Sequence, residues 1–249
     1  MFHENKDAIY YPENLFLWFL LALQGGFVNV GGFLAVHRFV SHMTGFGTWI
    51  GVELAESKYL DTIGMMAVPT FFLIGAMCSA WLIERERMKK RFPKYRIVFS
   101  MMIFMFLLIA TLGVMSFFGY YGEPFNYRRD YVLLFMLTFV CGLQNAVISS
   151  ASGAVVRTTH LTGVTTDLGI GLVRLCTDRH HFTKKDNKEL FATFFRVGII
   201  TSFVSGSIIG AFIFKSFAFW GFYLPAIISF FVMLKLRPKL EPEHLTTNL

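Results

Sequence analysis

Long apolar runs with almost no charged residues dominate the chain, and short polar stretches separate them. Most runs are near the roughly 20 residues that a helix needs to cross the hydrocarbon of a bilayer. The pattern predicts an all-α integral membrane protein with six transmembrane helices, at about residues 15–36, 60–83, 97–119, 131–155, 197–214 and 216–234.

Two further apolar runs are much shorter, at about residues 44–55 and 162–175. At 1.5 Å per residue each reaches roughly 15–20 Å, about half of a bilayer. We predict that they do not cross the membrane but dip into it as re-entrant half-helices. Irregular backbone at that depth is tolerated where it is buried in protein or lines a wet cavity.

Basic residues support this topology, because cytoplasmic loops carry an excess of Lys and Arg. The stretch 84–96 holds seven of them, and basic residues also gather at 174–189 and near the C-terminus. With six crossings, all three clusters and both termini are predicted to be cytoplasmic. With eight crossings, the last two clusters would lie outside, against the rule.

One motif occurs twice and indicates an internal duplication. Residues 42–51 and 160–169 both read H-x-T-G-x-x-T-x-x-G, and each copy follows an apolar run that carries a Leu-Gln pair. Gly75 and Gly206 lie in the apolar runs that follow the motifs. We predict two repeats of three helices each, 1–119 and 120–249. The charge topology places the two motif loops on opposite sides of the membrane, so the repeats are inverted.

Composition narrows the class of protein further. Apolar residues make up 55% of the chain and charged residues 16%, against roughly 25% charged in soluble domains. We expect a single membrane domain, 1–249, without a soluble domain. The formal net charge of +7 lies beside the ends of the apolar runs, so it indicates topology rather than nucleic-acid binding. The three cysteines lack metal-ligand spacing.

The motif residues are the main candidates for a solute-binding site. A Thr-Gly pair suits the start of a half-helix, where Thr caps and Gly permits close approach to a ligand. Helix N-termini present free N–H groups and a partial positive charge, which suit an anion or a carbonyl. Polar residues within the long runs and an Arg before each motif His complete the set. The candidate substrate-binding residues are Gln24, Asn29, Arg38, His42, Thr44, Gly45, Thr48, Gln144, Asn145, Arg157, His160, Thr162, Gly163, Thr166 and Asp167.

Structural roles for the same residues stay open. The glutamines and asparagines could hydrogen-bond between helices, the arginines could reach the headgroups, and the histidines could be satisfied at an interface. Arg196 could also reach the headgroups or could pair with Asp167. A zinc site would need more ligands than the sequence offers, so no metal and no cofactor is expected. No nucleophile–base pair or paired-carboxylate site is recognisable, so an enzyme is not supported.

The chain resembles the YoaK-like family of small multi-pass bacterial membrane proteins, whose function is unknown. The resemblance is carried by residues 26–29 and 39–45, and by 142–146 and 157–163. Family members commonly have Asp where Asn29 stands and Asn where Phe46 stands. The resemblance implies a bacterial inner-membrane protein and supplies no substrate.

The leading hypothesis is a small-solute transporter or channel whose site lies near the membrane midplane, between the two Thr-Gly turns, with an anionic or neutral solute preferred. The alternatives are a non-transport ligand sensor, a heme- or metal-binding scaffold using His42 and His160, or a partner subunit of another membrane complex. The expected partners are membrane lipid and a small solute, and a homo-oligomer is left open.

Overall fold

Helices account for every regular element in the described part of the chain, which comprises residues 12–153, 156, 158–177 and 184–236 of this computed structural model. In chain order they are α1 (Pro12–Val36), α2 (Met43–Ala55), α3 (Tyr59–Met88), α4 (Tyr95–Val114), α5 (Tyr127–Ala151), α6 (Leu161–Thr177), α7 (Lys184–Phe217), the 3₁₀ helix η2 (Ala218–Phe222) and α8 (Tyr223–Lys235). The all-α prediction is therefore confirmed for these residues.

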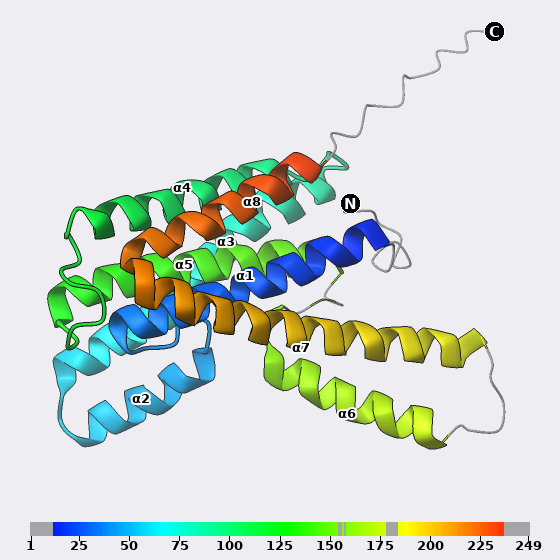
Figure 1. Cartoon of the computed structure of the whole chain (residues 1–249), viewed down its shortest axis with the longest axis horizontal. Helices are drawn as coiled ribbons and strands as arrows, with labels where there is room; N and C mark the ends of the chain where they lie inside the picture. Colours follow the sequence, from blue (N-terminus) through cyan, green and yellow to red (C-terminus); the bar gives the residue numbers. More distant parts are fainter. Residues whose placement is uncertain (1–11, 154–155, 157, 178–183, 237–249) are drawn as a thin grey trace, which may run out of the picture.

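Five helical stretches are long and apolar enough to cross a membrane, as expected of a multi-pass membrane protein. They are Asn14–Val36, Tyr59–Met88, Tyr95–Val114, Arg129–Ala151 and Glu189–Lys235. The number six is not confirmed, because the last stretch contains two of the predicted helices. Within it, Ala218 has a left-handed backbone (φ 47°), and α8 turns back from the end of α7 (Figure 1). With 13 residues, α8 is shorter than the predicted helix 216–234.

The two short runs form the separate short helices α2 and α6, with 13 and 17 residues. At 1.5 Å per residue they extend over roughly 20 and 26 Å. Both begin near the middle of the long axis of the molecule and run toward opposite ends (Figure 1). Helix α2 packs on α3, and α6 packs on α7.

The basic stretch 174–189, predicted to be cytoplasmic, is helical at all of its described residues. Helix α6 continues to Thr177 and α7 already begins at Lys184. Charged side chains continue onto α7, where Glu189 and Arg196 form an ion pair of 2.9 Å two turns apart. The suggested pairing of Arg196 with Asp167 is not found among the described residues, where the Arg196 guanidinium is directed to Glu189.

Glycines allow two pairs of long helices to touch backbone to backbone. A Cβ on Gly206 of α7 would lie 2.0 Å from the carbonyl oxygen of Leu23 on α1, and one on Gly26 would lie 2.0 Å from that of Phe203. Helices α3 and α5 cross in the same way. There the glycines are Gly75 and Gly142, and a Cβ on each would lie 2.1 Å from a carbonyl oxygen on the other helix. Small residues at such crossings are typical of membrane helices.

The packing scheme repeats between the halves. Helix α1 packs along α7, and α5 packs along α3. Helix α4 packs mainly against α8. Each long crossing therefore joins a helix of residues 1–119 to one of residues 120–249. Large side chains fill the shared core, among them Trp18, Phe27, Phe99, Phe106 and Phe214, all fully buried.

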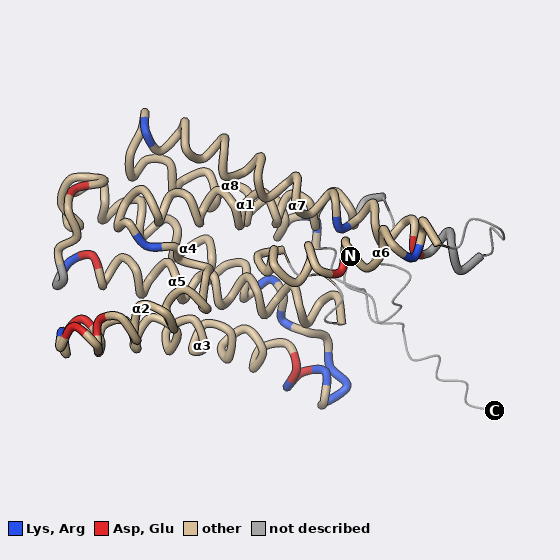
Figure 2. Tube along the Cα trace, turned by 90° about the horizontal axis from the view of Figure 1, so that it is seen from below, with Lys and Arg blue, Asp and Glu red and all other residues tan. Residues whose placement is uncertain are grey.

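Basic residues are in excess at one end of the bundle, where Glu84, Glu86 and Glu189 also lie (Figure 2). The end with the α3–α4 junction, the C-terminal end of α6 and the end of α8 is basic: Arg85, Arg87, Lys89, Lys90, Arg91, Lys94, Arg96, Arg174 and Lys235. The opposite end carries five acids among the described residues, namely Glu53, Glu56, Asp61, Glu123 and Asp130. Bases there include Lys58, Arg129 and Lys215.

Candidate functional site

The repeated motif forms the first turns of α2 and α6, as predicted, but Thr does not cap them. Helix α2 begins at Met43, so the residue before it is His42, which makes no side-chain capping bond. Helix α6 begins at Leu161, so both threonines stand second in their helices. The cap prediction is wrong because a capping residue stands just before the first helical residue. From the second position in the helix, the hydroxyl does not reach the free N–H groups of the first turn.

The motif threonines instead line one face of each short helix. The Thr48 hydroxyl donates to the Thr44 carbonyl (3.4 Å), and the Thr166 hydroxyl donates to the Thr162 carbonyl (2.9 Å). All four side chains are exposed. Gly47, Gly51 and Gly169 lie on the same helices, and a Cβ on any of them would meet nothing within 4 Å. The polar faces of α2 and α6 are therefore not covered by the described remainder of the chain.

The motif glycine has a specific steric role in the first copy. A Cβ on Gly45 would lie 2.8 Å from Nδ1 of His42, and the Gly45 N–H donates to the His42 carbonyl at 3.0 Å. The glycine thus lets the His42 ring fold over the first turn, where it also meets Phe39 edge-on at 6.1 Å. In the second copy, the His160 carbonyl accepts from the Val164 N–H at 3.1 Å, and Gly163 is half-buried.

Two asparagines fasten the segments that lead into the short helices. On α1, Oδ1 of Asn29 accepts bonds from the backbone N–H and the hydroxyl of Ser41, at 3.3 and 3.0 Å. On α5, Oδ1 of Asn145 accepts a bond from the hydroxyl of Thr159. Ser41 and Thr159 each directly precede a motif His. We call these two contacts the asparagine clasps.

The asparagine clasps indicate which residues of the two halves occupy equivalent positions. Asn29 and Asn145 each lie three residues after a glycine of the close crossings, Gly26 and Gly142. This register matches Asn with Asn and places Gln144 opposite Val28. The Leu-Gln pairs of the sequence comparison are therefore displaced by one helical turn and are not equivalent.

The two glutamines bond to each other in the core. Nε2 of Gln24 donates to Oε1 of Gln144 (3.2 Å) and to the hydroxyl of Ser229 on α8 (3.1 Å). Gln144 in turn donates to the Leu21 carbonyl at 2.9 Å. All three polar side chains are buried. This is the interhelical bonding that the sequence left open as the alternative to a cavity lining.

Two buried polar atoms near the second clasp lack a partner among the described residues. They are Nδ2 of Asn145 and the hydroxyl of Thr158, a residue that is fully buried. Unmet polar groups in an apolar interior cost roughly 1–3 kcal/mol each. Sequence reasoning missed Ser41, Thr158, Thr159 and Ser229. The hydroxyl residue before each motif His was a visible signal for two of them.

The predicted cationic residues are not both placed beside the Thr-Gly turns. The Arg38 guanidinium lies over the rings of Trp49 on α2 and Phe125, at 4.3 and 5.2 Å from their centroids. It also donates to the His37 carbonyl at 3.1 Å. Arg157 lies outside the described residues. Asp167 is exposed on α6.

The structure does not bring the two motif copies into contact. Helices α2 and α6 do not pack against each other in the described part of the chain. In the same part, no three His, Cys, Asp or Glu side chains are grouped so that they could hold a metal ion. A cavity shared by both Thr-Gly turns stays a prediction.

A family model described as "Protein of unknown function (DUF1275)" matches residues 17–235. Since this is most of the chain, the protein belongs to that family, which is consistent with the YoaK-like resemblance. No curated protein and no solved structure matches the chain significantly.

Proposed function

We propose that this DUF1275 protein is a small-solute transporter or channel, with α2 and α6 as re-entrant half-helices. One observation carries the proposal: both helices begin halfway along the bundle and present uncovered threonine faces there. Polar groups and helix starts at half depth cannot face hydrocarbon, so they line a wet path or a protein contact.

The two halves are proposed to be inverted repeats related by an axis in the membrane plane. The exchange of partners between the halves, α1 with α7 and α5 with α3, supports a two-fold relation. The opposite directions of α2 and α6 support its inversion (Figure 1). In this proposal α7 and α8 cross separately, which gives six crossings with three in each repeat.

The basic end of the bundle is proposed to be cytoplasmic. The charge segregation of Figure 2 is what the positive-inside rule produces. Helix α1 begins and α8 ends at this end (Figure 1), so both termini would be cytoplasmic. In a bacterial cell, which the resemblance implies, the membrane would be the inner one.

The proposed solute is small and neutral or anionic. The first turns of α2 and α6 leave backbone N–H groups without helical partners, and these groups favour carbonyl or anionic oxygens. The threonine hydroxyls next to them can donate or accept. Arg38 contributes less than expected, because its guanidinium is held by Trp49 and Phe125.

A homo-oligomer is proposed to close the path, since the described chain leaves the faces of α2 and α6 open. Gly47 and Gly51 are four residues apart on α2 with free space above them, the spacing that lets membrane helices approach closely. Gly47→Cys in a background without the three native cysteines should form disulfide-linked dimers in membranes. An exclusively monomeric product, with Trp81→Cys as the lipid-facing control, would contradict this part.

Solute flux into proteoliposomes tests the function directly. Thr44→Val and Thr162→Val should each lower uptake of the solute found by screening, by roughly tenfold for one lost hydrogen bond of about 1.4 kcal/mol. Thr70→Val is the control, because Thr70 is an exposed threonine on α3, outside the faces of α2 and α6. Equal flux in all three variants and the wild type would exclude these faces from the path.

A further inference from the structure

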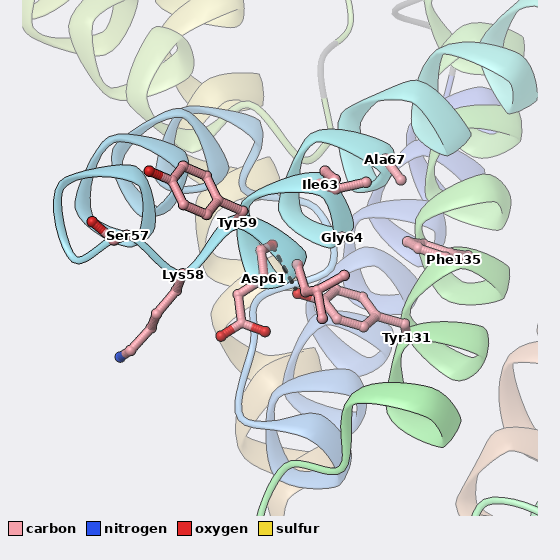
Figure 3. A pocket seen from close by; sticks show the side chains of 10 residues that line it. Ser57, Lys58, Tyr59, Asp61, Ile63, Gly64, Ala67, Tyr131 and Phe135 are labelled. Carbon is pink, nitrogen blue, oxygen red and sulfur yellow. Dashed lines mark hydrogen bonds between the residues drawn. The ribbon is translucent and has the colours of Figure 1, made fainter.

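A hollow opens beside the start of α3, away from the threonine faces (Figure 3). Its volume is about 970 Å³, at the upper end of the range for small-molecule sites. One end is lined by Lys58, Tyr59 and Asp61. The floor and far wall are formed by Gly64, Ala67 and Phe135. The hollow therefore has a polar end and an apolar end.

Small residues on α3 and a fixed aromatic wall on α5 create this shape. A Cβ on Gly64 would lie 2.3 Å from Cζ of Tyr131, so the glycine lets the ring lie flat against α3. The Tyr131 hydroxyl donates to the Asp61 carbonyl at 3.2 Å. Phe135 stacks on both Tyr131 and Phe71, at centroid distances of 5.5 and 4.5 Å. The wall is thus held in place without a ligand.

The polar end offers both a cation and a free carboxylate. Nζ of Lys58 bonds to Glu56 at 2.5 Å, and both side chains are about half exposed. The Lys58 ammonium places a positive charge at this end of the hollow, and a phosphate oxygen is attracted to such a charge. Within the described part of the chain, the Asp61 carboxylate takes part in no ion pair or hydrogen bond, and in Figure 3 it points away from the apolar wall.

The surroundings indicate a ligand that comes from the membrane. Leu60 and Ile63 flank the hollow and are exposed, although they lie in a stretch apolar enough to span a bilayer. Tyr59 and Tyr131 stand at the helix ends, as tyrosines do at membrane interfaces. A ligand here would place its polar part at the boundary and its apolar part along α3.

We propose that this hollow binds one phospholipid with a zwitterionic headgroup carrying a primary ammonium. The ammonium donates to Asp61, the phosphate accepts from Lys58, and an acyl chain lies over Gly64 and Ala67 against Phe135. A quaternary ammonium has no N–H to donate to Asp61. An anionic headgroup without an amine would meet the Glu56 and Asp61 carboxylates. The order of affinity is therefore phosphatidylethanolamine above phosphatidylcholine and phosphatidylglycerol.

Native mass spectrometry of the full chain in detergent, with each of the three lipids added in turn, tests the proposal. The wild type should retain phosphatidylethanolamine about tenfold better than phosphatidylcholine, as expected for one charge-assisted bond. Asp61→Asn should remove this preference, while Asp167→Asn, which changes an exposed acid on α6, should keep it. Ala67→Phe should abolish retention of all three lipids, and Ile208→Phe on the exposed side of α7 should not.

Equal retention of the three lipids by the wild type would overturn the headgroup assignment. Unchanged retention in Ala67→Phe would overturn the site itself. Neither outcome bears on solute flux, because the hollow and the threonine faces share no residue.

Discussion

In the first half Asn29 accepts both the backbone N–H and the hydroxyl of Ser41, whereas in the second half Asn145 accepts the hydroxyl of Thr159 alone among the described residues. Within the same part of the chain, Nδ2 of Asn145 has no hydrogen-bond partner. Asn29 thus holds its segment by two hydrogen bonds, whereas Asn145 holds its segment by one and has an unused donor beside it. If solute or water enters the path near the clasps, the second half is the one with a hydrogen bond to offer.

The ends of the short helices differ between the halves in a second way. Glu56 and Arg174 each lie fourteen residues after a motif His, and Lys58 and Glu189 each lie seventeen residues before a crossing glycine. Glu56 pairs with Lys58 at 2.5 Å, and Arg174 pairs with Glu189 at 3.6 Å. Equivalent positions thus carry the same contact with the charges exchanged. This is expected under the proposed inversion, in which the ends of α2 and α6 lie at opposite ends of the bundle.

The largest expected effect comes from the glycine crossings, which the halves share. Gly75→Ala and Gly206→Ala each force a methyl group into a backbone carbonyl. Each should lower the free energy of unfolding by about 2–3 kcal/mol, as overpacking does. Thermal unfolding of the purified protein in detergent would measure this. Gly51→Ala and Gly169→Ala, which have open space, are the controls. A large loss in only one of the crossing variants would show that the halves are not packed alike.

The glutamine contact distinguishes the halves, because Gln24 and Gln144 are not equivalent. Gln24→Leu leaves the Ser229 hydroxyl and Oε1 of Gln144 without their hydrogen-bond partner and should cost about 1–2 kcal/mol of stability. Gln24→Leu combined with Gln144→Leu should cost less than the sum of the single changes, which denaturation of all four proteins would reveal. Strict additivity would mean that the two amides do not interact.

The clasps should give a smaller and unequal effect. Asn29→Ala removes two accepted bonds and Asn145→Ala removes one, so we expect losses of about 1–2 and about 1 kcal/mol of stability. Hydrogen exchange at residues 37–42 and 158–160 would report on the two segments separately. Faster exchange in both segments after either single change would show that the clasps act as one unit.

The exchanged ion pairs should have the smallest effect. Lys58→Ala breaks an exposed pair and should change stability by less than about 0.5 kcal/mol. Glu189→Ala should cost about 1 kcal/mol, because Arg196 is only 23% exposed and loses its carboxylate. Melting curves at low and high salt would separate the two. Equal losses of stability in Lys58→Ala and Glu189→Ala would show that the two ion pairs do not differ in strength.

Apolar run length and motif repetition were sufficient to predict the helices, and α2 and α6 above all. Their limits were predicted within a few residues because short apolar runs between polar stretches leave few alternatives. The shorter α8 could not be predicted, since no residue type in 216–222 demands the left-handed turn at Ala218. The helical start of α7 was missed because a run of charged residues resembles a loop, although Glu189 pairs with Arg196 along one helix face.

The candidate site was predicted less well than the fold. Its residues fall on the expected elements. However, Gln24 and Gln144 hydrogen-bond to each other, and the Arg38 guanidinium lies over two aromatic rings. Such partners depend on which helices pack against each other, and the sequence alone does not show this packing. The two Leu-Gln pairs were aligned one helical turn out of register for the same reason. The equivalence of Gly26 and Gly142 follows only from their contacts at the helix crossings.

Both glycine crossings join one half of the chain to the other, and this has a consequence for biosynthesis. Helices α1 and α3 are made first, yet the helices they cross, α7 and α5, emerge from the ribosome later. The early helices must therefore wait in the bilayer with their glycine faces open, held only by lipid or by an insertion factor. We expect residues 1–119 made alone to be degraded rapidly, and to be rescued when residues 120–249 are made in the same cell as a separate chain.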